Sequence, residues 1–317
     1  MILRLFLAVL LLLAAPCTWA VELPGIPQFI GEMVSKHHFR RAMLVRLFKH
    51  AKHRQAIIDA ISKPATLKPW LEYRAAFVNA QRIGGGLEFW QRHAEALQRA
   101  QQQYGVPQEI IVALIGVETR YGLNAGKYST LDALTTLAFD YPRRADFFRD
   151  ELEQYLLLAR EQKLNMLEVQ GSYAGALGIP QFMPSSYRKY AVDFSGDGKV
   201  DLLSDPVDAI GSVANYLKQY GWQNGAPVAV RASVSEDNCV GSLAEAHSLA
   251  EWVAAGAKPD KEIASDMKAR LLDFTVTDGK EFWLAFGNFD VITRYNNSDF
   301  YAMSVLQLAE ALREARK

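Results

Sequence analysis

The chain has 317 residues, half of them apolar and 11% aromatic, so it can form two or three domains with a large hydrophobic core. Lysine plus arginine and aspartate plus glutamate balance at 35 each. This balance excludes the net basic field that holds nucleic acid, and we expect no nucleic-acid partner.

The N-terminus predicts an export signal. A basic residue is followed by Leu5–Ala15, an apolar stretch of eleven that is too short to span a bilayer and suits a signal-peptide core. Small residues end the segment, so we expect residues 1–20 to be removed after Ala20, which leaves a soluble periplasmic protein. The alternative is a lipid anchor on Cys17, which Pro16 disfavours because lipoprotein signals need a small, flexible residue there. Retention as an uncleaved anchor is the least favoured outcome.

Helices are predicted from residue 28 to about residue 104, because apolar side chains recur at helical spacing. The clearest are Phe29, Met33, Phe39, Met43, Leu47, Phe48, Trp70, Tyr73, Phe77, Leu87, Trp90 and Leu97. Gly84–Gly86 is expected to interrupt them as a flexible connector. A phosphate-binding loop is less favoured, because the lysine and the preceding strand are missing.

Helical patterns continue through the middle of the chain and return at its end. The expected helices are Gln108–Arg120, Thr130–Phe139, Arg144–Glu161, Pro206–Tyr220 and Asp299–Ala315.

From Ala226 the pattern changes to short runs typical of strands. The expected strands are Val228–Ala232, Leu271–Val276, Glu281–Phe286 and Phe289–Thr293, with one helix at Leu243–Ala255. Thr277–Lys280 has the composition of a hairpin turn. Residues 223–290 therefore predict a small α/β insert.

Glu118 is the strongest catalytic candidate. It lies near the C-terminal end of a buried helix, with Gly122 as a stop signal. Burial and the negative end of the helix dipole both disfavour the anion, so we expect the pKa of this carboxyl to be raised. A carboxylic acid that stays protonated near neutral pH can donate a proton to a leaving oxygen. An ion pair with Arg120 is the alternative that the residues alone leave open.

The segment Gly171–Tyr187 combines glycine, polar and aromatic residues. Its glycines let backbone approach a ligand closely. Ser172 and Gln181 can bind polar substituents, and Phe182 can stack on a sugar face. An ordinary tight loop is the alternative.

Two further segments carry groups suited to a polar substrate. Arg143 and Arg144 are adjacent cations before a helix, although surface solubility alone would explain them. Tyr295 and Asn296 precede the last helix and offer hydroxyl and amide groups that suit sugar hydroxyls and N-acetyl groups. For this segment the alternative is a helix start capped by Ser298.

Residues 193–208 are similar to an EF-hand calcium loop, with oxygen ligands at positions 1, 3 and 5 and glycine at position 6. Position 12 is Ser204 rather than glutamate, so we expect a lengthened loop closed by Asp208 rather than by Asp205. Asp208 would lie in the first turn of a helix that begins at Pro206, with Asp205 as its N-cap. An Asp-Gly turn without metal is the less favoured alternative. The expected ligands of a structural calcium ion are Asp193, Ser195, Asp197, the Lys199 carbonyl and Asp208.

Together these motifs resemble the lytic murein transglycosylases of the membrane-bound lytic transglycosylase B family. The resemblance extends from about Pro27 to Leu312. It rests on Gly116–Gly122, Gly171–Ser186, the aspartate-rich loop and Arg294–Asn296, which occur in the family's order and spacing.

The resemblance implies a mainly α (α+β) fold, with a lysozyme-like core domain, a helical domain and a small β-containing inserted domain. On this sequence the helical domain would be 21–104 joined by the C-terminal helix 302–317. The core would be 105–222 plus 291–301 and would include the EF-hand-like loop 193–208. The insert would be 223–290.

The resemblance also implies roles for the candidate site residues, with Glu118 as the catalytic acid. Ser172, Gln181, Tyr295 and Asn296 would lie near the reacting sugar, Arg143 and Arg144 near the peptide stem, and Tyr73, Phe182 and Tyr216 along the substrate groove.

The implied reaction cleaves the β-1,4 bond between N-acetylmuramic acid and N-acetylglucosamine and forms a 1,6-anhydromuramoyl end, for cell-wall turnover. The partners would be peptidoglycan glycan strands, with cell-wall synthesis proteins as further candidates, and no catalytic cofactor is expected. Most glycosidases use two carboxylates, and no second one lies within the motifs expected to face Glu118. A hydrolytic muramidase and a non-catalytic peptidoglycan-binding scaffold are the alternatives.

Overall fold

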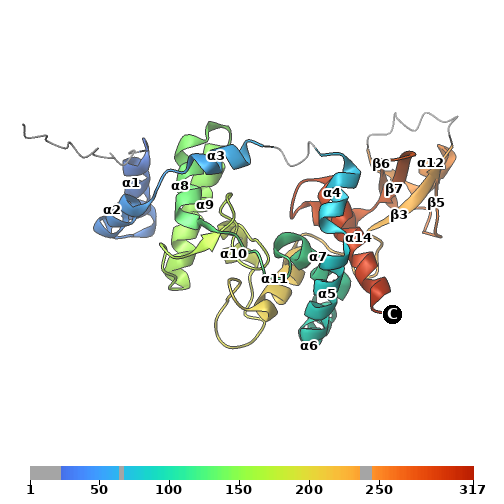
Figure 1. Ribbon diagram of the computed structural model, residues 1–317, viewed down its shortest axis with the longest axis horizontal. Helices are drawn as coiled ribbons and strands as arrows, with labels where there is room; N and C mark the ends of the chain where they lie inside the picture. Colours follow the sequence, from blue (N-terminus) through green and yellow to red (C-terminus); the bar gives the residue numbers. More distant parts are fainter. Residues whose placement is uncertain (1–22, 64–67, 236–244) are drawn as a thin grey trace, which may run out of the picture.

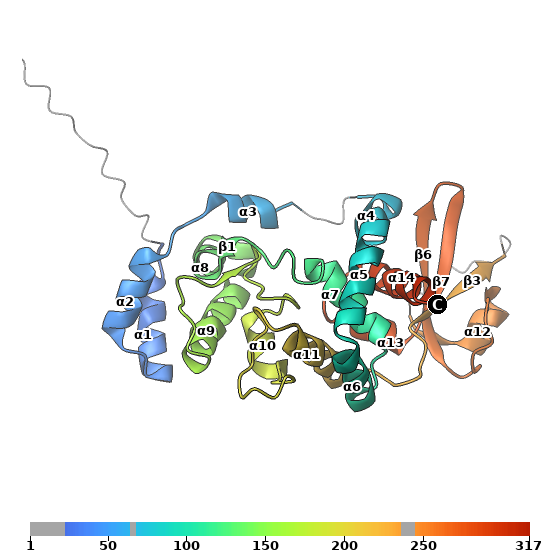
Figure 2. The ribbon, with the colours of Figure 1, turned by 60° about the horizontal axis from the view of Figure 1, so that its bottom comes forward.

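The computed structural model describes residues 23–63, 68–235 and 245–317, so the expected signal segment 1–20 lies outside the described residues. Two groups of helices lie side by side, and a small sheet flanks the second group (Figures 1 and 2). The fold is mainly α with a lysozyme-like core, as predicted. Within the described residues, no helix is both long and apolar enough to cross a membrane.

The first group surrounds a pair of buried antiparallel helices. Its helices are α1 (Ile26–His37), α2 (Arg41–His50), α3 (Gln55–Ile61), α8 (Thr130–Asp140), α9 (Ala145–Glu161) and α10 (Pro184–Tyr190). The ring of Phe29 on α1 meets that of Phe139 on α8 edge-on at 5.9 Å. Asp132, only 5% exposed, accepts hydrogen bonds from the Lys52 amide at 2.8 Å and from Arg54 Nε at 2.9 Å. These bonds attach the α2–α3 connection to α8.

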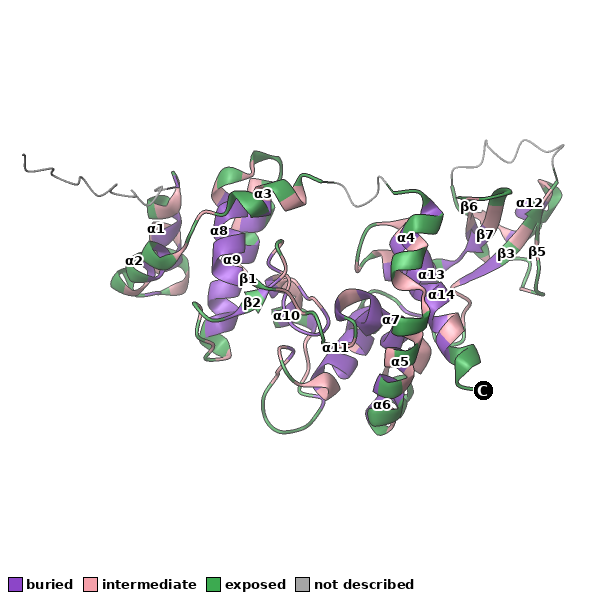
Figure 3. Cartoon of the chain, viewed as in Figure 1, coloured by how far each residue is buried: buried purple, intermediate pink, exposed green. Residues whose placement is uncertain are grey.

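The second group is built around two central helices, α7 and α14, both largely buried (Figure 3). Its helices are α4 (Trp70–Phe77), α5 (Ala80–Arg92), α6 (Ala94–Tyr104), α7 (Gln108–Thr119), α11 (Pro206–Gln219), α13 (Gly287–Thr293) and α14 (Asp299–Ala315). The expected helical domain 21–104 therefore packs in two places. Helices α1 and α3 contact α8, with α2 packed on α1, whereas α4–α6 contact α7, α11 and α14.

The triple glycine lies inside α5 and does not interrupt it, so the predicted connector at Gly84–Gly86 is wrong. A Cβ atom on Gly86 would lie 2.5 Å from both Tyr121 Oη and Leu312 Cδ2. The glycines therefore let α5 approach the end of α7 and helix α14 closely, and this packing outweighs their poor helix propensity.

The insert is a five-stranded antiparallel sheet in the order β4-β6-β7-β3-β5. Its elements are β3 (Ala229–Val234), β4 (His247–Ser248), α12 (Leu249–Ala254), β5 (Ala257–Pro259), β6 (Lys268–Val276) and β7 (Gly279–Ala285). The predicted hairpin is confirmed, with Val276 paired to Gly279 across the turn. Trp252 and Leu284, both 0% exposed, centre a core separate from the main one.

Two predicted elements near the insert differ from the structure. Phe289–Thr293 forms most of helix α13, not a strand. Phe289 and Ile292 are 0% exposed at a spacing of three, so packing against α14 decides the outcome over the β-branched composition. The helix predicted at Leu243–Ala255 begins at Leu249 with a capping box from Ser248, and residues 236–244 lie outside the described residues.

Candidate active site

Helix α7 brings Glu118 to its last turn and ends one residue later, as the sequence predicted. Arg120 and Tyr121 follow with left-handed φ angles of 52° and 64°, so the chain turns sharply. Thr119 Oγ1 donates to the Ile179 carbonyl at 2.8 Å and accepts from the Gly122 amide at 2.9 Å. These bonds fix the end of α7 against the Gly171–Tyr187 segment.

The Glu118 side chain is only partly exposed, and protein groups surround its carboxyl. Tyr301 Oη, from the first turn of α14, donates to Glu118 Oε1 at 2.5 Å. Burial raises the pKa of Glu118 from 4.5 to about 7, against the lowering effects of the Tyr301 hydrogen bond and of Arg82. Both the protonated and the ionised form of Glu118 are therefore populated near neutral pH, which suits a general acid and base.

Several tyrosines enclose this carboxyl. The pKa values of Tyr73 and Tyr295 are raised, mainly by burial and then by the charge of Glu118. The ring of Tyr295 lies 4.9 Å from Tyr216 and 5.8 Å from Phe182. Phe182 is 2% and Tyr216 5% exposed, so both rings are packed beneath the site and leave little surface for a sugar.

Ser172 and Gln181 are held by backbone groups, which for Gln181 include a carbonyl outside their own segment. Ser172 Oγ accepts from the amides of Ala174 at 3.2 Å and Ala176 at 3.0 Å. Gln181 Nε2 donates to the carbonyls of Ala125 at 3.0 Å and Gly178 at 2.9 Å. Both side chains are partly exposed, so the Ser172 hydroxyl hydrogen and the Gln181 amide oxygen are the groups left for a ligand.

The remaining candidates lie at the surface. Arg143 and Arg144 form the short helix η2 (Pro142–Arg144) between α8 and α9, and both are exposed. The Arg144 guanidinium lies 4.3 Å from the ring centre of Phe147. Asn296 is exposed beside the partly exposed Tyr295, whose hydroxyl donates to the Pro180 carbonyl at 2.5 Å.

Two residues that act on the catalytic candidate, one by a hydrogen bond and one by its charge, were not found by sequence reasoning. Tyr301 belongs to a segment that was singled out, yet only Tyr295 and Asn296 were given roles there. Arg82 carries no motif and reaches Glu118 only through the packing of α5 on α7. The groups that face Glu118 in the described part of the chain are Tyr73, Arg82, Tyr295 and Tyr301, and no second carboxyl is among them.

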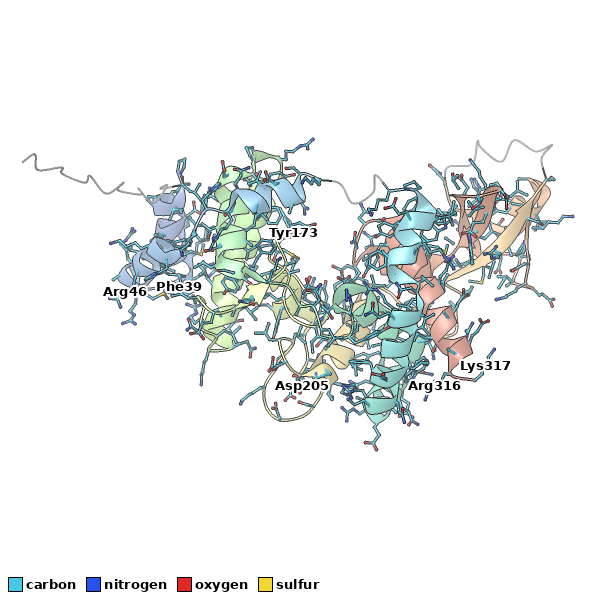
Figure 4. The ribbon with its side chains drawn as sticks, viewed as in Figure 1. Phe39, Arg46, Tyr173, Asp205, Arg316 and Lys317 are labelled. Atoms are coloured by element: carbon cyan, nitrogen blue, oxygen red, sulfur yellow. The ribbon has the colours of Figure 1, made fainter. Side chains whose placement is uncertain are left out.

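The aspartate-rich loop is ordered by its own backbone. Asp193 Oδ1 accepts from the Gly196 amide at 2.7 Å, and Oδ2 from the Gly198 amide at 2.8 Å. Asp208, 1% exposed, accepts from the amides of Phe194 at 2.8 Å and Asp201 at 2.8 Å. As predicted, Asp205 caps α11, accepting from the Val207 amide at 2.7 Å (Figure 4).

The donor set of this loop is suited to calcium in kind, because every expected ligand is an oxygen. Asp193, Ser195, Asp197 and Lys199 are exposed, and left-handed glycines at 196 and 198 make the tight turns that such loops need. Across the described residues, however, no three acidic, histidine or cysteine side chains converge on one point. Calcium binding would therefore draw the exposed side chains inward around Asp208.

Comparison with known proteins shows similarity over almost the whole chain. Residues 24–310 match the family described as transglycosylase SLT domain. The chain is 46% identical over 303 residues to the membrane-bound lytic murein transglycosylase B of Escherichia coli strain K12, covering 92% of this chain and 84% of that protein.

Two solved structures are similar throughout. Soluble lytic transglycosylase SltB1 from Pseudomonas aeruginosa has a TM-score of 0.87 and 49% identity, over 92% of this chain and 99% of that one. The Escherichia coli lytic transglycosylase SLT35 in complex with calcium has a TM-score of 0.87 and 45% identity, over 93% and 94% of the two chains. The chain therefore belongs to the lytic murein transglycosylase B family.

Proposed function

We propose that this protein is a lytic transglycosylase that cleaves the β-1,4 bond between N-acetylmuramic acid and N-acetylglucosamine in peptidoglycan. The observation that carries the proposal is a single enclosed carboxyl, Glu118, with a pKa of about 7 and no second carboxyl among the described groups that face it. Membership of a family of peptidoglycan lytic transglycosylases supports the same activity.

One carboxyl can serve both steps of this reaction. Protonated Glu118 gives its proton to the glycosidic oxygen as the bond to the anomeric carbon breaks. The N-acetyl group of the muramic acid supports the developing positive charge. The Glu118 carboxylate then removes the proton of the 6-hydroxyl, whose oxygen attacks the anomeric carbon. This step closes a 1,6-anhydro ring, returns the proton to Glu118 and consumes no water.

Neighbouring residues position the substrate in this scheme. The Ser172 hydroxyl, the Gln181 amide oxygen and the Asn296 amide supply hydrogen bonds to the reacting sugars. Tyr73 and Tyr295 form the aromatic wall of the site, with Phe182 and Tyr216 packed beneath Tyr295. The exposed guanidinium groups of Arg143 and Arg144 suit the carboxylates of a stem peptide.

Digestion of purified sacculi tests the function. The wild-type protein should release soluble fragments whose muramic ends are one water lighter than those from a lysozyme digest. Products of full hydrolytic mass would instead assign a hydrolytic muramidase. A wild-type protein that binds sacculi and releases nothing would assign a wall-binding scaffold.

In this proposal the calcium ion stabilises the fold and takes no part in the reaction. Asp193, Ser195, Asp197, the Lys199 carbonyl and Asp208 would hold it, and it would fix the start of α11 against the preceding loop. Support comes from the oxygen-only ligand set and from the similar chain whose structure is a complex with calcium.

We also propose that the protein acts in the periplasm after loss of residues 1–20, with glycan strands as its main partner. Peptidoglycan lies in that compartment, and the export signal predicted at Leu5–Ala15 leads there. Intact mass of the exported protein tests this, because a chain starting at Val21 is expected. A diacylglycerol adduct on Cys17 would assign the lipid-anchored alternative.

A further inference from the structure

Arg82, on α5, joins the C-terminal ends of two other helices. Its Nη1 atom donates to the Gly116 carbonyl and, at 3.3 Å, to the Val117 carbonyl, both in the last turn of α7. Its Nε atom donates to the Ala76 carbonyl near the end of α4 at 3.1 Å. The Gly116 carbonyl also accepts from the Arg120 amide at 3.1 Å, and a cation at the end of a helix opposes the negative end of its dipole. One guanidinium thus caps the helix that carries Glu118.

The packing of Tyr121 between α5 and α7 fixes the position of Arg82 relative to α7. Tyr121 Oη donates to the Arg82 carbonyl at 2.7 Å. A Cβ atom on Gly86 of α5 or on Gly116 of α7 would lie 2.5 Å from that same hydroxyl oxygen. The Tyr121 ring therefore fits between α5 and α7 at the two glycines, Gly86 and Gly116. This packing holds Arg82 opposite the last turn of α7.

The charge of Arg82 acts on a carboxyl with otherwise uncharged neighbours. Glu118 faces Tyr73 from α4, Tyr295 from the segment after α13 and Tyr301 from α14. Arg82, from α5, is the one cation that lowers the pKa of Glu118 in the described part of the chain. Arg120 lies close enough to act on Arg82 itself.

We propose that Arg82 is a positioning residue, which fixes the last turn of α7 and keeps the Glu118 carboxylate usable as a base in the second step. The inference rests on the proposed function, because only a single-carboxyl mechanism needs one group to release and regain a proton. Burial raises the pKa of Glu118, and the Tyr301 hydrogen bond and then the charge of Arg82 lower it. The charge of Arg82 helps to bring the pKa of Glu118 toward the working pH, where acid–base catalysis is most efficient.

The test compares the pH profiles of kcat for three variants on soluble glycan fragments. R82M removes the charge and the cap. R82K keeps the charge but cannot reach three carbonyls as a planar guanidinium does. R160M is the matched control, because Arg160 also donates to a helix-end carbonyl, that of His37 at 2.7 Å, and packs on the ring of Phe39 at 4.2 Å.

We expect R82M to move the alkaline limb of the profile to higher pH, because the proton of Glu118 is lost later when the cation is gone. Its kcat at the optimum should fall by up to about 10²-fold, the loss typical of a reacting group displaced by about 1 Å. R82K should lower kcat and leave the limb in place, and R160M should change neither. An alkaline limb that stays unchanged in a folded R82M would overturn the proposal.

Two further measurements keep the result decisive. If R82M does not fold, R82Q carries the same prediction, since its amide keeps one donor while the charge is lost. If the wild-type protein shows no activity, the proposed function fails, and the inference is then tested alone by titrating the Glu118 carboxyl with ¹³C NMR. That titration should move to higher pH in R82M, and an unshifted titration would reject the role of Arg82.

Discussion

Glu118 and the 193–208 loop hold their carboxyl groups in opposite ways. Glu118 lies among tyrosines, and burial raises its pKa to about 7 although Tyr301 donates a hydrogen bond to it. Asp193 lies on an exposed loop, where backbone amide hydrogen bonds outweigh desolvation and hold its pKa below the usual range. The environment therefore decides which acid can hold a proton near neutral pH and which stays an anion.

The largest effect separating the two sites is expected from Glu118→Gln. Glutamine keeps the size and the acceptor for Tyr301 but can neither give nor take the proton. One group serves both steps here, so activity on sacculi should fall at the top of the roughly 10²–10⁴-fold range for acid–base catalysis or beyond it. Glu151→Gln is the matched control, because Glu151 is also buried and bonded, to Ser185 at 2.6 Å and 2.9 Å. Near-normal digestion by E118Q would remove Glu118 from the mechanism.

The same variant should reveal the cost of burying this acid. Folded Glu118 binds its proton more tightly than the unfolded chain, with a pKa of about 7 against 4.5. Wild-type stability from this group is therefore greatest below pH 4.5 and is lost as the pH rises through 7. E118Q should gain at most about 3 kcal/mol over the wild type between those limits. Urea unfolding at both ends of the range measures the gain, and parallel stability curves would contradict the raised pKa.

Calcium binding by the 193–208 loop should stabilise the fold and so test the loop half of this comparison. If the loop binds the ion, the free energy of unfolding should rise by about 2.7 kcal/mol at a hundredfold excess over Kd. Melting with chelator and with added calcium measures the rise, and magnesium serves as the ionic control. Asp193→Asn should abolish the response, whereas Asp260→Asn, on the remote insert, should keep it. A melting temperature indifferent to calcium would leave the loop as a turn without metal.

The smallest effect is expected from Ser172→Ala. The Ser172 hydroxyl satisfies two amides of its loop, so its loss should cost roughly 1–2 kcal/mol of stability and about tenfold in activity. Ser248→Ala, in the insert, is the matched control. The Ser248 hydroxyl also accepts from a backbone amide, that of Glu251 at 3.3 Å. Equal activity in the two variants would assign Ser172 a purely structural role.

The sequence predicted correctly those elements that depend on local signals. Hydrophobic spacing predicted α7 and the place of Glu118 at its end, and the Thr277–Lys280 turn predicted the β6–β7 hairpin. It failed where packing decides, since α13 is a helix under α14 and the three glycines continue α5.

Tyr301 was missed for a related reason. Its contact with Glu118 spans 183 residues of chain, and no spacing rule covers such a distance. The roles of Glu118, of the substrate-binding candidates and of the calcium ligands stay predictions, because such roles show only with a bound substrate or ion.

The most direct measurement of the central claim is the pKa of Glu118 itself. Carboxyl ¹³C titration of glutamate-labelled protein gives this value, with the Glu118 signal assigned by its absence in E118Q. A midpoint of about 7 is expected for Glu118 in the folded wild-type protein. A midpoint near the ordinary value of 4.5 would contradict it, because Glu118 would then be an anion at neutral pH and unable to start the reaction.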